Sequence, residues 1–351
     1  MGRRRQQQEG RKEERRGDSN SLDKQQQLLL VLQARQTEVE DEYDFAGRCL
    51  FNKTGYYILD LHTGKVSNLP RTLQHGAAPL SSMVALDSRI YIFGCQIYQS
   101  GHQHSGGGVF SCPDPRLSYS LDLTNSQTSS SWKEVSPPFS ADQCQLAGVV
   151  AFQDKIYFFR GLRFSCLCEV YDPHLSQWSR IKSPPGTAAG EKLNNISTMY
   201  GYYPCEDRWE CLLEDFGGCF SIGDPITVAD GVIYEYAHYR EIHGFFRAFD
   251  LATKEWLNVR VAPVFLDTYE SYLHISTYHG LLHLPNSILC LLSSIYEDHE
   301  PGQPQTTAVH VVQFKVELVK VDDKKEVLVT PLSSRYCHLD SRCYVFRCLR
   351  L

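Results

Sequence analysis

A strand–turn–strand pattern that recurs along the chain constrains the fold more than any other feature of the sequence. Its first copy, residues 83–94, reads MVALDSRIYIFG, with an apolar run, a turn at Asp87 and Ser88, and a second apolar run. β-Branched and aromatic residues favour strands, and Asp favours the turn between them. Four further copies lie at residues 149–160, 227–237, 276–284 and 336–347, with Asp154, Asp230, His279 and Asp340 at the turn. This repetition predicts an array of small β-units.

Two further strands are predicted after the copies. The third strand ends in an apolar or aromatic residue followed by Asp, and the fourth strand begins near a Trp. The segments are Tyr119–Leu123 with Trp132, Glu169–Pro173 with Trp178, and Phe246–Leu251 with Trp256. We expect Asp122, Asp172 and Asp250 to accept hydrogen bonds from backbone N–H groups in turns, rather than to act in catalysis.

These motifs resemble the kelch repeat, in which each repeat forms one four-stranded blade of a β-propeller. The resemblance covers roughly residues 45–351. It implies an all-β fold, a β-propeller of kelch-like blades, whose Tyr and Trp side chains fill the space between adjacent blades. The sequence departs from the family at the double glycine after the second strand, which is represented only by Gly94–Cys95 and Arg160–Gly161.

The number of blades depends on how the two ends of the chain are used. Residues 56–61 and 66–70 resemble the third and fourth strands of a unit, whereas residues 336–347 supply only the first two. The simplest arrangement joins these fragments in one shared blade that closes the ring. Alternatively, residues 47–51 are a second strand and the first blade is separate. The interval 182–223 is long enough to hide another blade, so we predict five or six blades and favour six.

Residues 1–42 are predicted to be a disordered basic and Gln-rich tail, with the propeller at residues 43–351. The first twenty residues contain no large hydrophobic residue beyond Met1 and cannot fold by burial. The basic run that begins at Arg3 is a solvated tail, which we favour, a nuclear import signal, or a tether to an anionic surface. The apolar run at residues 28–32 is too short for a membrane span and lacks a signal-peptide cleavage site. We therefore expect a cytoplasmic or nuclear protein without a membrane partner.

Two polar loops, residues 99–116 and 284–307, are the candidate interaction sites, because long loops on one face of a repeat array commonly bind partners. Their exposed candidates are His102, His104, Arg116, Tyr296 and His299. His102 and His104 could bind a metal ion, but the sequence shows no third ligand at a suitable spacing from them, so no metal site is predicted. The 13 cysteines, an odd number, indicate free thiols in a reducing compartment.

Motifs for catalysis are sparse, since GxSxG, P-loop and HExxH patterns are absent from the sequence. The first hypothesis is a non-catalytic protein–protein interaction scaffold without a cofactor. The kelch resemblance implies a substrate-recognition subunit in ubiquitination, although residues 1–42 show no F-box or BTB pattern. The alternative that it implies is a kelch-type metal-dependent enzyme, an oxidase or a specifier-like protein. Nucleic-acid binding through the basic tail is disfavoured by the net charge of −6. The partner and the oligomeric state stay open.

Overall fold

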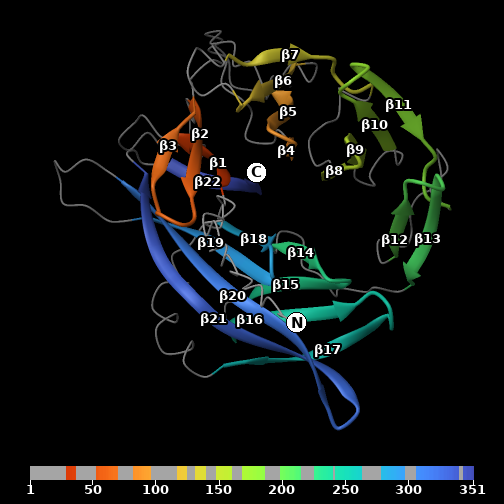
Figure 1. The fold of residues 1–351 in the computed structure, drawn as a ribbon, viewed down its shortest axis with the longest axis vertical. Coiled ribbons are helices and arrows are strands. Elements are labelled where there is room, and N and C mark those ends of the chain that lie inside the picture. Colours follow the sequence, from red (N-terminus) through yellow and green to blue (C-terminus); the bar gives the residue numbers. More distant parts are fainter. Residues whose placement is uncertain are drawn as a thin grey trace, which may run out of the picture.

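The computed structural model consists of strands and turns wherever it describes the chain (Figure 1). The described residues are 29–36, 53–69, 82–95, 117–124, 131–139, 148–159, 168–185, 198–214, 225–239, 242–262, 278–296, 306–339 and 343–351. The predicted all-β class is confirmed for these residues, none of which lies in a helix. Consequently, a helix long and apolar enough to cross a membrane is not found in the described ranges.

The described strands form five sheets, one of which has eight strands in two antiparallel sets of four, so we distinguish six units of antiparallel strands. Unit 1 contains β22 (Cys343–Arg350), β1 (Leu29–Gln36), β2 (Lys53–Asp60) and β3 (Val66–Asn68). Unit 2 contains β4 (Ser82–Leu86), β5 (Arg89–Cys95), β6 (Leu117–Asp122) and β7 (Lys133–Val135). Unit 3 contains β8 (Gly148–Phe152), β9 (Lys155–Phe159), β10 (Cys168–Asp172) and β11 (Gln177–Ile181), and the described strands of unit 4 are β12 (Met199–Tyr203) and β13 (Arg208–Leu213). Unit 5 contains β14 (Ile226–Ala229), β15 (Val232–Tyr239), β16 (Ile242–Asp250) and β17 (Glu255–Val261), and unit 6 contains β18 (Tyr278–Leu284), β19 (Ile288–Tyr296), β20 (Thr307–Val321) and β21 (Lys324–Leu339).

Short turns in the left-handed backbone region join the first and second strands of units 2, 3 and 5. The φ angles of Asp87, Asp154 and Asp230 are 53°, 58° and 49°. Asp tolerates this region because its short side chain can hydrogen-bond locally. The first three copies of the sequence pattern therefore fold as predicted, each into the first hairpin of a unit.

The hairpins predicted for the fourth and fifth copies do not form. His279 lies inside β18, and the turn that follows uses Asn286 and Ser287, with φ angles of 65° and 55°. Residues 336–339 end β21, which pairs with β20, whereas β22 pairs with β1. Asp340 lies outside the described residues. The Pro285–Ser287 segment is a better turn former than the His279–Gly280 pair, because Asn readily takes a left-handed conformation.

The two ends of the chain meet in unit 1, where β1 lies between β22 and β2. A shared closing unit is confirmed, but it takes one strand from the C-terminal part and three from the N-terminal part instead of two from each. The predicted tail of residues 1–42 is corrected as well, since its residues 29–36 are a strand. Leu30, Val31 and Leu32 are fully buried, so this apolar run gains hydrophobic free energy from its neighbours.

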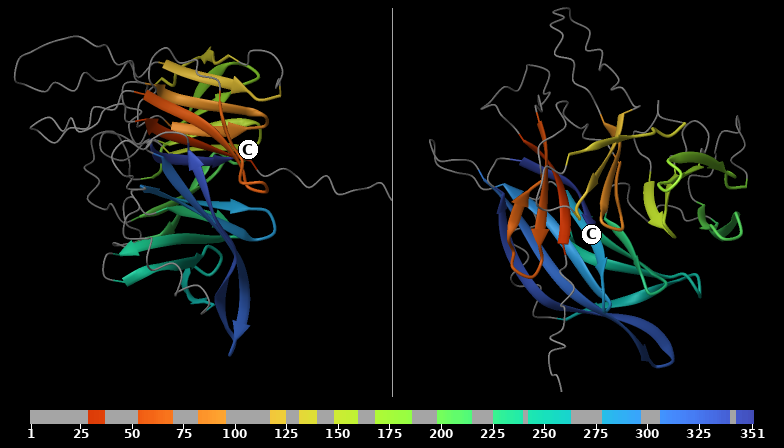
Figure 2. Two further views of the ribbon diagram at one scale, coloured as in Figure 1. Left: turned by 90° about the vertical axis from the view of Figure 1, so that its left-hand side faces the viewer. Right: turned by 45° about the horizontal axis from the view of Figure 1, so that its top comes forward.

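Units 5 and 6 are joined edge to edge in one eight-stranded sheet. Residues 258–261 of β17 pair in parallel with residues 326–329 of β21. The long β20–β21 hairpin carries this contact and projects beyond the other units (Figures 1 and 2). At the same junction, Lys325 Nζ lies 2.8 Å from Asp250 Oδ2. These contacts clamp the outer edges of the two units together.

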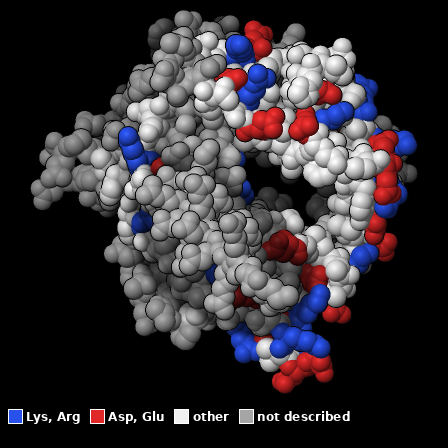
Figure 3. Space-filling view, viewed as in Figure 1, with Lys and Arg blue, Asp and Glu red and all other residues white. Residues whose placement is uncertain are grey.

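The units follow one another around a central opening, which the space-filling view shows directly (Figures 1 and 3). Clusters of buried apolar side chains lie between successive units in the described part of the chain. Pairs of cluster members from the two units are Val31 and Leu121 (units 1 and 2), Phe93 and Trp178 (units 2 and 3), Phe246 and Phe314 (units 5 and 6), and Leu292 and Leu32 (units 6 and 1). Each of these units thus buries a sheet face against the next one.

Candidate functional site: the connection face of the ring

The aspartates that close the third strands hold the turns that follow them. Oδ1 of Asp122 accepts hydrogen bonds from the backbone N–H of Thr124 at 2.9 Å and from its hydroxyl at 2.6 Å. Asp172 and Asp250 accept backbone N–H groups in the same way, at 3.0 Å and 2.9 Å. The hydrogen bonds from Thr124 lower the pKa of Asp122, because they favour the charged carboxylate. The predicted turn role of the three aspartates is confirmed.

Tryptophans of the fourth strands tie successive units together. Trp178 of unit 3 donates its indole N–H to the carbonyl of Ser136, which follows β7 of unit 2, at 2.7 Å. Its ring lies 5.4 Å from the ring of Phe93 in unit 2 and 5.0 Å from that of Tyr171. Trp209 of unit 4 repeats the hydrogen bond across the next junction, to the carbonyl of Lys182 at 2.6 Å. The predicted filling of the inter-unit space by Tyr and Trp is confirmed at these junctions.

The ring has two faces with different connections. In an antiparallel meander, successive connections leave at opposite ends of the strands. The turn face carries the first-to-second and third-to-fourth connections, which are short, such as residues 87–88 and 173–176, except for residues 123–132 between β6 and β7. The connection face carries the second-to-third connections, which span residues 96–116, 160–167, 240–241 and 297–306 in units 2, 3, 5 and 6. The second-to-third connections therefore differ in length from unit to unit, whereas the first-to-second turns of units 2, 3 and 5 are all two residues long.

The prediction of one loop over residues 284–307 is wrong, because the segment contains a strand. Residues 288–296 form β19, whose apolar residues Leu289, Leu291 and Leu292 are buried, because a run of this kind is stabilised inside a sheet rather than in water. The connection that remains is residues 297–306.

One predicted contact residue, Tyr296, belongs to a strand that the structure describes. His102, His104, Arg116 and His299 lie outside the described residues and stay predictions. Tyr296 is the last residue of β19 and is opposite Thr307 in the ladder with β20; its side chain is outside the described part of the chain. Of these two segments, the structure describes only the strands that flank them, β5 and β6 for one and β19 and β20 for the other.

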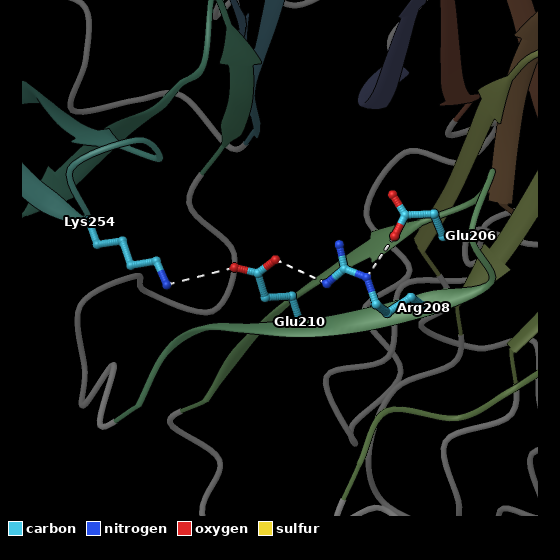
Figure 4. Close-up of polar contacts among 4 residues, drawn as sticks. All are labelled: Glu206, Arg208, Glu210 and Lys254. Carbon is cyan, nitrogen blue, oxygen red and sulfur yellow. Dashed lines mark hydrogen bonds and ion pairs between the residues drawn. The ribbon is translucent and has the colours of Figure 1, made fainter.

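A chain of ion pairs on the turn face was not signalled by any sequence pattern (Figure 4). Arg208 Nε lies 2.8 Å from Glu206 Oε2, and Arg208 Nη1 lies 3.2 Å from Glu210 Oε2. Lys254 Nζ, from the β16–β17 turn of unit 5, lies 3.9 Å from Glu210 Oε1. The hydrogen bond from Arg208, followed by that from Tyr203, lowers the pKa of Glu210. The pair between Glu210 of β13 and Lys254 therefore links unit 4 to unit 5.

Buried titratable groups outside these contacts have structural roles. His310, only 4% exposed, stacks on Tyr336 with ring centroids 4.4 Å apart, and its Nε2 lies 2.7 Å from the hydroxyl of Ser334. Burial lowers the pKa of His310 to about 4, so the ring is neutral near pH 7. Burial likewise raises the pKa of the Cys290 thiol, which keeps it protonated and unreactive. Within the described ranges, His, Cys, Asp and Glu side chains do not gather in threes in a way that would hold a metal ion.

Comparisons with known proteins give no family. No family model matches the chain, and no curated protein matches it. Among solved structures, TolB from Acinetobacter baumannii is similar with a TM-score of 0.41 and 11% identity, over 88% of this chain and 66% of TolB. The acylaminoacyl peptidase of Pyrococcus horikoshii is similar with a TM-score of 0.37 and 10% identity, over 80% of this chain and 55% of the peptidase. An endo-1,4-beta-xylanase from Bacteroides thetaiotaomicron is similar with a TM-score of 0.33 and 10% identity, over 74% of this chain and 96% of the xylanase. This chain spans just under two thirds of TolB, and likenesses this low carry no argument about function.

Proposed function

We propose that the protein is a six-bladed, kelch-like β-propeller that serves as a non-catalytic protein–protein interaction scaffold. The six units around one opening and the recurring Trp ties support the propeller part of this proposal. The family resemblance extends the proposal to a substrate-recognition role in ubiquitination, in the cytoplasm or nucleus.

The single observation that carries the scaffold proposal is the contrast between the two faces. Turns that only close hairpins need few residues, and the first-to-second turns of units 2, 3, 5 and 6 follow that rule with two or three residues each. The connection after β5 is far longer than the ladder requires, since β15 and β16 make the equivalent connection with residues 240–241. Long, unit-specific connections on a rigid framework are where binding residues are usually held. We therefore place partner binding on the connection face.

A loop replacement tests this proposal. Residues 99–115 are replaced by a short Gly–Ser linker, and both proteins are used to capture partners from cell extract, followed by mass spectrometry. A control variant carries Asp87→Asn and Asp154→Asn, which change the charge of the turn face while keeping residues that accept a left-handed backbone. We expect partners that bind the unaltered chain and the control but not the loop variant, with all three melting alike. Partners that survive the loop replacement and are lost in the control would reverse the assignment of the faces.

A further inference from the structure

The β20–β21 hairpin extends further than the strands beside it. β20 pairs with β21 up to residue 321, just before the turn at residues 322–323. Its pairing with β19 stops at Lys315, which lies opposite Ile288. Among the described strands, β20 therefore has a neighbour on one side only along residues 317–321 (Figure 1). We call the other side of these five residues the open edge, because a strand of this kind presents a row of backbone N–H and C=O groups to which another strand can pair.

A hydrogen bond next to β19 shows which backbone groups face the open edge. The N–H of Val316 donates to the carbonyl of Ser287, in the turn before β19, at 2.9 Å, so the backbone groups of Val316 point away from β21. Backbone groups alternate in direction from residue to residue along an antiparallel strand. The ladder between β20 and β21 keeps one register from Phe314 to residue 321. Leu318 and Lys320 therefore direct their N–H and C=O groups to the open edge.

The side chains at the end of the hairpin suit pairing with a second copy of the same strand. Leu318 is 45% exposed, and Val319 is half-buried. Residues 315–326 contain four lysines and four acidic residues, so this end of the hairpin has no net charge. Lysines on an edge oppose strand pairing when their charge is unbalanced. Lys320, however, forms an ion pair with Asp323 at 2.7 Å, so two copies meet without net repulsion.

One register of such a pairing fits the open edge. Two identical antiparallel strands related by a two-fold axis place one residue opposite its own counterpart. With Val319 at the axis, residues 317–321 of the two copies pair with each other, and Leu318 lies opposite Lys320 of the second copy. With Leu318 at the axis, the second copy would extend onto Lys315, where β19 already pairs. With Lys320 at the axis, two lysines would lie directly opposite each other, which is unfavourable.

We propose that the protein forms a two-fold symmetric dimer through the open edge of β20, in which the two β20–β21 hairpins join into one four-stranded antiparallel sheet. In the described structure, residues 319–325 form a ribbon of two strands, because the ladder with β17 begins only at Glu326. A two-stranded ribbon is marginally stable in water, and further strands stabilise it. The contact is small, so the dimer forms only as the concentration rises. The hairpin turn belongs to the turn face, so the dimer does not depend on partner binding at the connection face.

Sedimentation velocity and light scattering over a range of protein concentrations test the dimer. We expect the average mass to rise from that of one chain toward that of two. Leu318→Lys places like charges opposite each other at both symmetric pairs, so the dissociation constant should rise about 2- to 30-fold. Combining Leu318→Lys with Lys320→Glu makes both pairs oppositely charged and should return the dissociation constant toward that of the unaltered protein. Leu332→Lys, at an exposed leucine of β21, is the matched control and should leave it unchanged.

Residue-resolved hydrogen exchange locates the contact. The amides of Leu318 and Lys320 should exchange fast in dilute protein and more slowly as the concentration rises. The amide of Val319, which faces β21, should be protected at every concentration. The proposal is overturned if the protein stays monomeric up to about 1 mM, or if Leu332→Lys weakens the dimer as much as Leu318→Lys does. Equal protection of the Leu318 and Lys320 amides at all concentrations would also overturn it, because another segment of the same chain would then cover the edge.

Discussion

Replacing Trp178 by Phe removes one tie between units 2 and 3 while keeping an aromatic ring in place. The indole N–H of Trp178 donates to the Ser136 carbonyl at 2.7 Å, and the side chain is 9% exposed. The lost hydrogen bond costs about 0.5–1.5 kcal/mol. The smaller ring also leaves space against Phe93, which adds about 1 kcal/mol of lost packing. We expect the free energy of unfolding to fall by about 2 kcal/mol.

Trp256→Phe is the matched control for this prediction. Trp256 is more exposed, and its ring contacts Phe249 and Arg247 of its own unit. The substitution keeps an aromatic ring and weakens the cation–π contact with Arg247, so we expect a loss below about 1 kcal/mol. Urea unfolding followed by circular dichroism measures both variants, because tryptophan fluorescence is itself altered. A Trp178→Phe loss no larger than that of Trp256→Phe would refute the claim that the indole ties adjacent units.

Three further predictions concern single side chains. The pKa of His310 is about 4 in the folded protein and near 6.5 in the unfolded chain, so the free energy of unfolding should decline by about 3 kcal/mol as the pH falls from 6.5 to 4. In urea titrations over this pH range, His310→Gln should flatten the decline. Asp250→Asn should cost about 1–2 kcal/mol, because it weakens the pair with Lys325 that clamps units 5 and 6; an unchanged urea midpoint would contradict the clamp. The hydrogen bond from Lys325 lowers the pKa of Asp250, so the carboxylate should contribute fully to stability above pH about 4 and lose this contribution as the pH falls further. Melting temperatures of the unaltered protein and of Asp250→Asn, measured against pH, would show this loss.

The hairpins around Asp87, Asp154 and Asp230 could be predicted because their signal is local. A few adjacent residues specify both the strands and a turn that accepts positive φ. The role of Trp178 was predictable for a related reason, since the aromatic residue of the third strand and the Trp lie opposite each other in the ladder, as Tyr171 does to Trp178. Local patterns thus predicted the first hairpins of units 2, 3 and 5 and the aromatic packing between units 2 and 3.

Unit 4 shows a signal that sequence reasoning left unused. Tyr202 lies opposite Trp209, and Phe249 lies opposite Trp256, with the same spacing in the sequence as Tyr171 and Trp178. This spacing alone identifies the third and fourth strands of unit 4 within the long interval after β11.

The remaining features depend on contacts between distant segments. The pairing of β1 with β22 joins the two ends of the chain, and the parallel pairing of residues 258–261 with residues 326–329 joins two units. Register between distant strands is set by which faces become buried in the assembled ring, so a local pattern does not reveal it. The connection-face candidates could be named from composition alone, and they have yet to be tested.

Hydrogen exchange of the protein with and without a captured, purified partner tests the scaffold proposal most directly. The account predicts that the partner slows exchange in residues 96–116 and 297–306, on the connection face, and leaves the turns at residues 87–88, 153–154 and 230–231 unchanged. Protection confined to those turns would contradict the account and move the binding site to the opposite face of the ring.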